Sequence, residues 1–143
     1  MTATDTATRT LVVERVMPHP PEKVWRALTQ GPLIEEWLLK NDFQPAVGRR
    51  FKLRNDPMPQ WDGVIDCEVL AIEPNRRLAY SWNALGLESV VTFTLTPENG
   101  STRLRMEQAG FRQGSENDRY FQGANYGWQK FLSNLDQTLA KLS

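Results

Sequence analysis

Apolar and polar residues alternate with a period of two through the middle of the chain. Phe51 and Leu53, for example, alternate with charged neighbours, and the same pattern recurs in four later segments. Because the side chains of a strand point alternately to its two faces, these segments predict strands with one buried and one solvated face. Asn99-Gly100, a strong hairpin signal, precedes the last of them. The predicted strands lie at about residues 49–54, 63–69, 78–82, 91–95 and 103–108.

A strand and two short helices are predicted before this region. The β-branched run Leu11–Met17 is typical of a strand, and the prolines that follow it end the strand. Pro21 and Glu22 favour a helix start, because proline fits the first turn and an acidic side chain stabilises the positive end of the helix dipole. The next glycine–proline pair breaks this helix, and Leu33–Leu38 is predicted to form a second one.

The C-terminal segment carries one apolar stripe at helical spacing. Ser115 with Asp118 resembles a capping box, and the helix predicted from Glu116 to Leu142 would be roughly 40 Å long. Its stripe needs a long apolar partner, and the dry face of the predicted sheet is the one candidate. The sequence therefore predicts an α+β fold: a curved antiparallel sheet of about six or seven strands wraps a long C-terminal helix, with two short helices after the first strand. The stripe consists of Phe121, Ala124, Trp128, Phe131, Leu132, Leu135, Leu139 and Leu142.

Length and composition favour one domain. A chain of 143 residues fits a single domain, and its first residues are rich in threonine and alanine. We predict a disordered arm at residues 1–9, which has neither the basic start nor the apolar stretch of a signal peptide, and one domain at 10–143. The 17 basic residues balance 17 acidic ones, so neither nucleic acid nor a membrane is expected as a partner. Cys67 is the one cysteine, which excludes an intrachain disulfide and favours a cytoplasmic location.

Four segments carry a family resemblance: Pro20–Thr29, Val47–Phe51, Glu73–Trp82 and Gly127–Leu139. Together they resemble the START-like (SRPBCC) superfamily, which has the helix-grip fold, and most closely its branch named after the activator of heat-shock-protein ATPase. Pro20–Thr29 is similar to that family's first helix, Val47–Phe51 to its entry into the second strand, and Glu73–Trp82 to its central hairpin. Gly127–Leu139 is similar to its final helix. The resemblance extends over about residues 10–142 and implies the helix-grip fold. Relatives of this shape include lipid carriers, polyketide cyclases and chaperone cofactors, so the fold alone implies no single function.

In a helix-grip fold, a ligand would bind between the dry face of the sheet and the long helix. The inward residues are mostly aromatic or aliphatic with few polar groups, as in pockets for apolar or aromatic small molecules, and binding of such a molecule is the leading hypothesis. The same residues could instead fill a solid core. Gln108 and Tyr80 carry polar groups that would hydrogen-bond either a ligand or a neighbouring backbone group, or lie at the rim. The predicted ligand-binding residues are Ile65, Cys67, Tyr80, Trp82, Val91, Phe93, Met106, Gln108, Phe121, Ala124, Asn125 and Trp128.

No catalytic constellation is evident, so an enzymatic function is not favoured. Cys67 has no histidine nearby in the motifs to activate it, and His19 lies between two prolines in a predicted loop. Asp66, Glu68 and Glu107 fall on the wet face, whereas acid–base catalysis needs a titratable group positioned in the cavity. A cyclase-type enzyme acting in the cavity is therefore the alternative hypothesis. The sequence shows neither a glycine-rich phosphate loop nor a cluster of metal ligands, and no cofactor is expected.

A third hypothesis, implied by the name of the family, is a module that interacts with a chaperone. Arg49, Arg50, Lys52 and Arg54 form a local basic cluster. This cluster is interpreted either as the solvated face of a strand or as a docking patch for such a partner.

Overall fold

The computed structural model describes residues 8–112 and 115–142, without the side chains of residues 8, 112 and 115–120. Within this part of the chain, seven strands form one antiparallel sheet and three helices lie against it. The α+β helix-grip architecture is therefore confirmed, with two short helices directly after the first strand. In chain order, the elements are β1 (Thr8–Met17), α1 (Pro21–Thr29), α2 (Gly31–Trp37), β2 (Lys40–Asn41), β3 (Arg50–Arg54), β4 (Val64–Glu73), β5 (Arg77–Ala84), β6 (Leu87–Glu98), β7 (Ser101–Arg112) and α3 (Ser115–Lys141).

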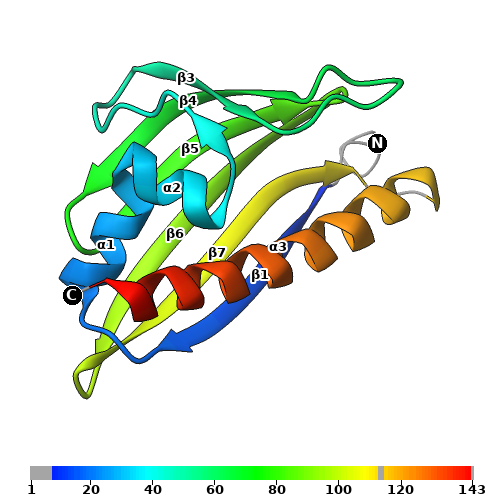
Figure 1. Ribbon diagram of the computed structural model, residues 1–143. Helices are drawn as coiled ribbons and strands as arrows, with labels where there is room; N and C mark the ends of the chain where they lie inside the picture. Colours follow the sequence, from blue (N-terminus) through cyan, green and yellow to red (C-terminus); the bar gives the residue numbers. More distant parts are fainter. Residues whose placement is uncertain (1–7, 113–114, 143) are drawn as a thin grey trace.

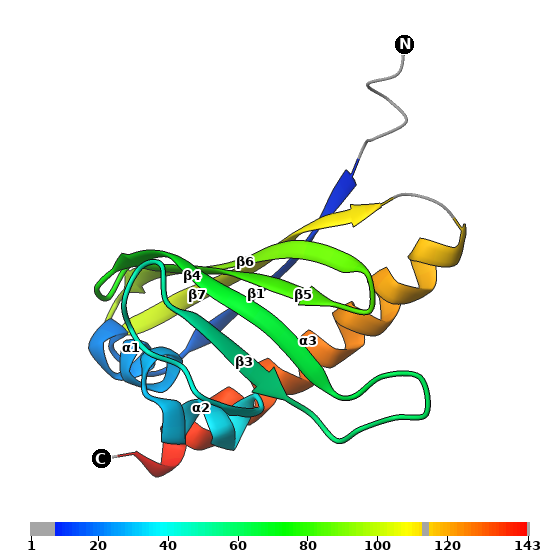
Figure 2. The same ribbon diagram turned by 90° about the horizontal axis from the view of Figure 1, so that it is seen from above.

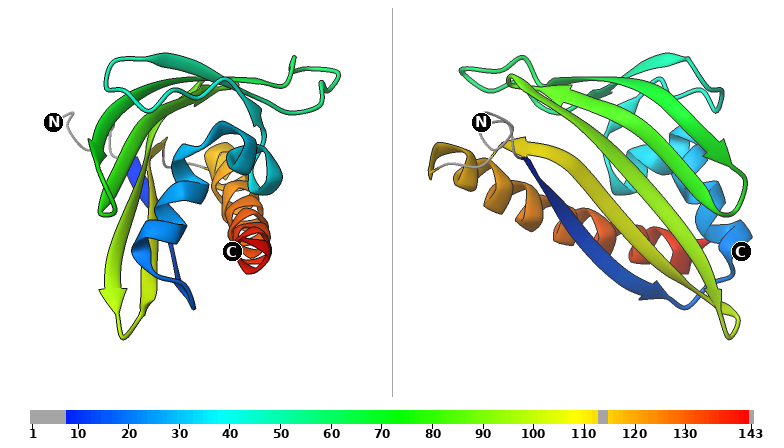
Figure 3. Two further views of the ribbon diagram at one scale, coloured as in Figure 1. Left: turned by 60° about the vertical axis from the view of Figure 1, so that its left-hand side comes forward. Right: turned by 180° about the vertical axis from the view of Figure 1, so that it is seen from behind.

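The sheet forms one curved layer, and the helices occupy its concave side (Figure 1, Figure 3). Its strand order is β1-β7-β6-β5-β4-β3-β2, so β2 to β7 follow one another as a meander and β1 returns to pair with β7. Helix α3 runs along β1 and β7, and α1 and α2 lie beside its C-terminal half (Figure 1). Because the sheet curves around the helices, its inward side chains and the stripe of α3 meet in one core.

Both edges of the sheet extend beyond the predicted strands. β1 begins at Thr8 rather than at Leu11, so the strand takes in the end of the predicted disordered arm. The rest of that arm, residues 1–7, lies outside the described residues. β2 contains only two residues, which are too few to show an alternation. It is held in place by the Asn41 amide, which donates a hydrogen bond to the Gly31 carbonyl oxygen at 3.0 Å.

Two tight turns join the strands β5, β6 and β7. Asn99 and Gly100, between β6 and β7, have φ angles of 53° and 83°, as the predicted hairpin turn requires. Leu85 and Gly86, between β5 and β6, adopt the same left-handed conformation with φ angles of 54° and 78°. Leucine rarely adopts a positive φ, and the sequence pattern did not indicate this second turn.

A bulge at Gly110 changes which side chains of β7 point inward. Opposite Gly110, the pairing of β1 with β7 shifts register between Arg9 and Thr10. Gly110 has a φ angle of 126°, and a Cβ atom at this position would lie 2.5 Å from the Glu88 carbonyl oxygen, so only glycine fits. The extra residue reverses the alternation of β7, and Phe111 is therefore 1% exposed in the core.

The apolar stripe of α3 is buried as predicted, but against more partners than the sheet. Trp128, Leu132, Leu135 and Leu139 are at most 2% exposed. The helix packs against α1 and α2 as well as β1 and β7, because these short helices also have apolar faces to cover. The predicted capping box at Ser115 lies among side chains that the structure does not describe. None of the described helices, α3 included, is long and apolar enough to cross a membrane.

Candidate functional site

Most of the predicted ligand-binding residues are buried more deeply than the lining of an open pocket requires. Trp82, Phe121 and Ala124 are half-buried and pack on the core. Asn125 is exposed, because at 3.6 residues per turn it lies on the flank of the stripe, and its Oδ1 accepts a hydrogen bond from Gln129 Nε2 at 3.5 Å. The structure therefore places Asn125 apart from the other predicted ligand-binding residues. The residues that are at most 5% exposed are Ile65, Cys67, Tyr80, Val91, Phe93, Met106, Gln108 and Trp128.

Aromatic rings form a connected row across the concave face of the sheet. The row runs from the loop after β2 through β3, β5 and β6 to α3, and successive ring centroids lie between 5.0 and 6.0 Å apart. Such edge-to-face and tilted contacts fill space closely. Side chains therefore occupy the middle of the predicted lining, as in a solid core. In order, the rings are Phe43, Phe51, Tyr80, Phe93, Trp128 and Trp82.

A buried hydrogen-bond network ties α3 to three strands. Trp128 Nε1 donates to Gln108 Oε1 at 2.8 Å, and Gln108 Nε2 donates to Ser89 Oγ at 3.0 Å. Ser89 Oγ in turn donates to the Trp82 carbonyl oxygen at 2.7 Å. The partners of the Gln108 amide are thus side chains of the core, rather than the backbone group or rim position considered from the sequence. Ser89 was missed, although extending the alternation of β6 back from Val91 places it inward.

Tyr80 is a buried member of the aromatic row, in contact with Phe51 and Phe93. It is 4% exposed, and its hydroxyl oxygen is not among the buried side-chain atoms that lack a hydrogen-bond partner. Burial, reinforced by the nearby Cys67, raises the pKa of Tyr80 well above 10.0. The side chain is therefore a neutral phenol.

Half-buried apolar side chains gather at the end of the sheet where β5 turns into β6. They come from this hairpin and from residues 121–131 of α3, and the contact between the rings of Trp82 and Trp128 joins the two segments (both are seen from above in Figure 2). Trp82 contacts Trp128 at a centroid distance of 5.3 Å, and Phe131 contacts Trp128 at 5.6 Å. The guanidinium of Arg9 lies 3.8 Å from the ring centroid of Phe121. We call this set the apolar rim: Trp82, Ala84, Leu87, Phe121, Ala124 and Phe131.

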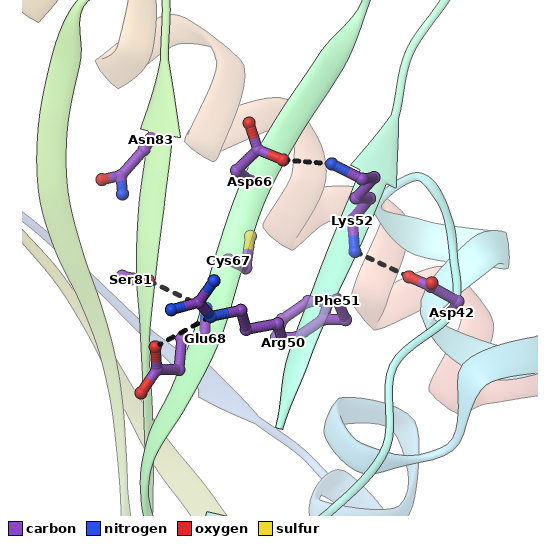
Figure 4. Close-up of a pocket in the computed structure, with 9 residues that line it drawn as sticks. All are labelled: Asp42, Arg50, Phe51, Lys52, Asp66, Cys67, Glu68, Ser81 and Asn83. Carbon is purple, nitrogen blue, oxygen red and sulfur yellow. Dashed lines mark hydrogen bonds and ion pairs between the residues drawn. The ribbon is translucent and has the colours of Figure 1, made fainter. Parts of the chain in front are cut away.

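A pocket of about 430 Å³ lies on the convex face, across β3, β4 and β5 (Figure 4). Cationic side chains of β3 face anionic ones of β4 there: Lys52 pairs with Asp66, and Arg50 Nε lies 3.6 Å from Glu68 Oε1. Because these charges are exposed and already paired, they attract a charged ligand only weakly. The pocket is lined by Asp42, Arg50, Phe51, Lys52, Asp66, Cys67, Glu68, Ser81 and Asn83.

The predicted basic cluster belongs to this convex face. All four residues are exposed: Arg49, Arg50, Lys52 and Arg54. Arg50 and Lys52 make the ion pairs just described. The Lys52 backbone N–H also donates to Asp42 Oδ1 at 2.6 Å. These contacts favour the interpretation of the cluster as the solvated face of a strand.

The two residues considered as nucleophile and base have ordinary structural environments. Burial, more than the charge of Asp66, raises the pKa of Cys67 to about 12, so the thiol stays protonated. His19 Nδ1 lies 3.1 Å from Lys23 Nζ, and burial and the charge of Lys23 lower the pKa of this histidine. Within residues 8–112 and 115–142, no group of three His, Cys, Asp or Glu side chains could hold a metal ion.

The chain resembles proteins of known structure over most of its length. Protein MLL2253 from Mesorhizobium loti is 55% identical with a TM-score of 0.86, and the match covers 94% of this chain and 99% of that one. DynU16, a putative protein in the dynemicin biosynthetic locus, is 26% identical with a TM-score of 0.76, over 92% of this chain and 47% of that one. CalU16 from Micromonospora echinospora is 25% identical with a TM-score of 0.76, over 94% of this chain and 78% of that one. No curated protein matches the chain.

A family model agrees with the resemblance that the sequence motifs indicated. The model described as "Activator of Hsp90 ATPase homolog 1-like protein" matches residues 18–140, from the loop before α1 through almost all of α3. This span includes the first-helix motif Pro20–Thr29 and the final-helix motif Gly127–Leu139. The chain therefore belongs to the family of Activator of Hsp90 ATPase homolog 1-like proteins.

Proposed function

We propose that this protein binds an apolar or aromatic small molecule between the sheet and α3. The observation that carries the proposal is the apolar rim, where side chains from β5, β6 and α3 stay half-buried beside an otherwise closed core. Covering apolar surface is worth about 25 cal/mol per Å² removed from water. A flat apolar molecule placed on the rim would gain this energy, and the half-buried rings of Trp82 and Phe131 would stack against it.

Deeper binding requires some rings of the row to give way, and the first half of α3 is the element best suited to move. Gly123 and Gly127 lie in this half, and each weakens a helix by about 1 kcal/mol relative to alanine. The second half is held by Leu132, Leu135 and Leu139, which are buried where α3 meets α1 and α2. A ligand would therefore enter by displacing the first half of α3 while the second half stays in place.

The two other hypotheses have less support from the site. A cyclase-type reaction needs an inward acid or base, and the strands place Asp66, Glu68 and Glu107 on the outer face. A chaperone that docked on the basic cluster would have to compete with the acidic partners of Arg50 and Lys52. The similarity to DynU16, a putative protein in the dynemicin biosynthetic locus, favours a small molecule over a protein as the ligand.

Titration with N-phenyl-1-naphthylamine, a neutral aromatic whose fluorescence rises in apolar surroundings, tests this proposal. The wild type should bind the probe, and Trp82→Ala should bind it at least about tenfold more weakly, because large buried aromatic side chains carry much of the energy of such contacts. Tyr126→Ala is the matched control, since Tyr126 is 74% exposed on α3 and is not part of the rim. A wild type without saturable binding, or an equal loss in both variants, would contradict the proposal.

A further inference from the structure

The buried hydrogen-bond network beneath the apolar rim has its directions fixed by the chemistry of its groups. An indole N–H can only donate and a backbone carbonyl oxygen can only accept. Trp128 Nε1 therefore donates to Gln108 Oε1, at 2.8 Å. Ser89 Oγ donates its one proton to the Trp82 carbonyl oxygen at 2.7 Å, so it accepts the remaining bond, from Gln108 Nε2 at 3.0 Å. The amide of Gln108 is thus held with its carbonyl oxygen towards α3.

The Gln108 carbonyl oxygen receives its hydrogen bond from the element that the proposed function displaces. Trp82, Ser89 and Gln108 belong to the neighbouring strands β5, β6 and β7, whereas Trp128 lies in the first half of α3. The two bonds of Ser89 therefore stay within the sheet, and only the bond from Trp128 joins the sheet to the helix. Displacing the first half of α3 takes this one donor away and leaves the amide of Gln108 held in place.

Loss of this donor leaves an acceptor in a place that water does not reach in the closed protein. Gln108 is 2% exposed and Ser89 is 5% exposed. A buried carbonyl oxygen without a donor is costly, because it has given up its hydrogen bonds to water. A ligand that enters between the sheet and α3 therefore breaks a buried hydrogen bond as it binds, unless it supplies a donor in place of the indole. This cost separates ligands by their chemistry.

The point of entry and the Gln108 oxygen are linked by one side chain. The ring of Trp128 contacts the rim residues Trp82 and Phe131, with centroids 5.3 and 5.6 Å away, and its Nε1 reaches Gln108. A flat molecule that takes the place of this ring beside Trp82 therefore comes within reach of the Gln108 oxygen. Phe93 lies on the same ring at 5.9 Å, so the surroundings are apolar and favour a neutral donor over a charged one.

We propose that the ligand is a neutral aromatic molecule with an N–H or O–H group on the edge of its ring, such as an indole or a phenol, and that this group replaces the indole of Trp128 as the donor to Gln108 Oε1. The inference rests on the proposed function, because both concern the same site. Aromatic molecules without a donor still bind the rim, but more weakly, since they leave the carbonyl oxygen unpaired. Gln108 is therefore a specificity-determining residue.

Two molecules with the same ring test this inference by isothermal titration calorimetry. 2-Naphthol carries an O–H donor, and 2-methoxynaphthalene has a methyl group in place of that proton. The wild type should bind 2-naphthol about tenfold more tightly, the difference expected for one buried hydrogen bond. Gln108→Met, which has a side chain of similar length without the carbonyl oxygen, should lose this preference. Tyr126→Phe is the matched control, because Tyr126 is 74% exposed on α3, and it should keep the preference of the wild type.

Trp128→Phe is a second variant, needed because Gln108→Met also breaks the network in the ligand-free protein. It removes the indole N–H that competes with the ligand and keeps the acceptor, so its preference for 2-naphthol should be at least as large as that of the wild type.

Three results would overturn the inference and leave the proposed function standing. They are equal affinities of the wild type for the two molecules, an undiminished preference in Gln108→Met, and loss of the preference in Trp128→Phe. A wild type that binds neither molecule, and does not bind N-phenyl-1-naphthylamine, would overturn both the inference and the proposed function.

Discussion

The two halves of α3 carry the same apolar stripe but meet different surroundings. In the second half, Leu132, Leu135 and Leu139 are 0% exposed and lie where α1 and α2 pack against the helix. In the first half, Phe121 and Ala124 are half-buried, and the short helices lie at the other end of α3 (Figure 2). The comparison shows that an apolar stripe becomes closed core only where other elements complete its cover. In the first half of α3, a ligand would complete the cover of the apolar stripe.

The largest expected effect belongs to the closed half. Leu135→Ala should cost about 2–5 kcal/mol of unfolding free energy, because the cavity it leaves is enclosed on all sides. Phe121→Ala removes a larger side chain but should cost less, since this ring is half-buried and solvent can fill part of the space. Urea unfolding of both variants measures the difference. A greater loss for Phe121→Ala would break the distinction between the two halves.

Gly110→Ala tests whether the bulge in β7 shapes the core beneath the first half of α3. A positive φ and a contact of 2.5 Å with the Glu88 carbonyl oxygen should together cost about 1–3 kcal/mol or more. Gly86→Ala is the control: its φ is also positive, at 78°, but a Cβ there meets nothing within 4 Å. Thermal unfolding should show the smaller loss for Gly86→Ala. Equal losses would mean that φ alone matters and that the close approach does not.

Tryptophan insertion sharpens the contrast between closed core and open rim. Met106 is 0% exposed, and Met106→Trp should destabilise the protein by about 1–3 kcal/mol through overpacking. Ala124→Trp, on the rim, should leave the unfolding temperature nearly unchanged and reduce the binding of N-phenyl-1-naphthylamine. Thermal unfolding and probe titration of both variants provide the measurements. A stable Met106→Trp variant would mean that space remains between the sheet and α3 that the packed rings do not fill.

The smallest effect is expected on the convex face, where ion pairs are exposed. The hydrogen bond from Arg105, at 2.7 Å, and the more distant Arg103 hold the pKa of Glu14 below 4.5. Because the pKa is lower in the folded state, the stabilisation is present at neutral pH and is lost as the pH falls through the folded-state pKa. Glu14→Gln should lower the unfolding temperature slightly at neutral pH and not at all at strongly acidic pH. A difference that persists in acid would show that the contribution is not electrostatic.

The overall fold was predictable because burial on one face imposes a period on the sequence. The alternation around Phe51 and the spacing from Trp128 to Leu139 both follow from this rule. Backbone conformation has no such periodic signature. The left-handed turn at Leu85, and the bulge at Gly110 that turns Phe111 inward, therefore could not be derived from alternation.

The candidate site was predictable only in part, since it depends on which neighbours cover each inward residue. The alternation of inward and outward residues placed Tyr80 and Gln108 on the inner face, but it could not show the hydrogen bond from Gln108 to Ser89. Asn125 was included because it borders the stripe, yet the twist of the helix leaves it exposed. The difference between the two halves of α3 arises from the placement of α1 and α2, which no local pattern encodes.

Amide hydrogen exchange with and without N-phenyl-1-naphthylamine is the most direct test of the claim that the uncovered half of α3 is the ligand site. The account predicts that the probe slows exchange in residues 121–131 of α3 and 82–88 of the β5–β6 hairpin. Residues 132–141, already enclosed, should exchange slowly and equally in both samples. Protection gained in residues 132–141, or on the convex face at 50–54, with none in the first half of α3, would contradict the account.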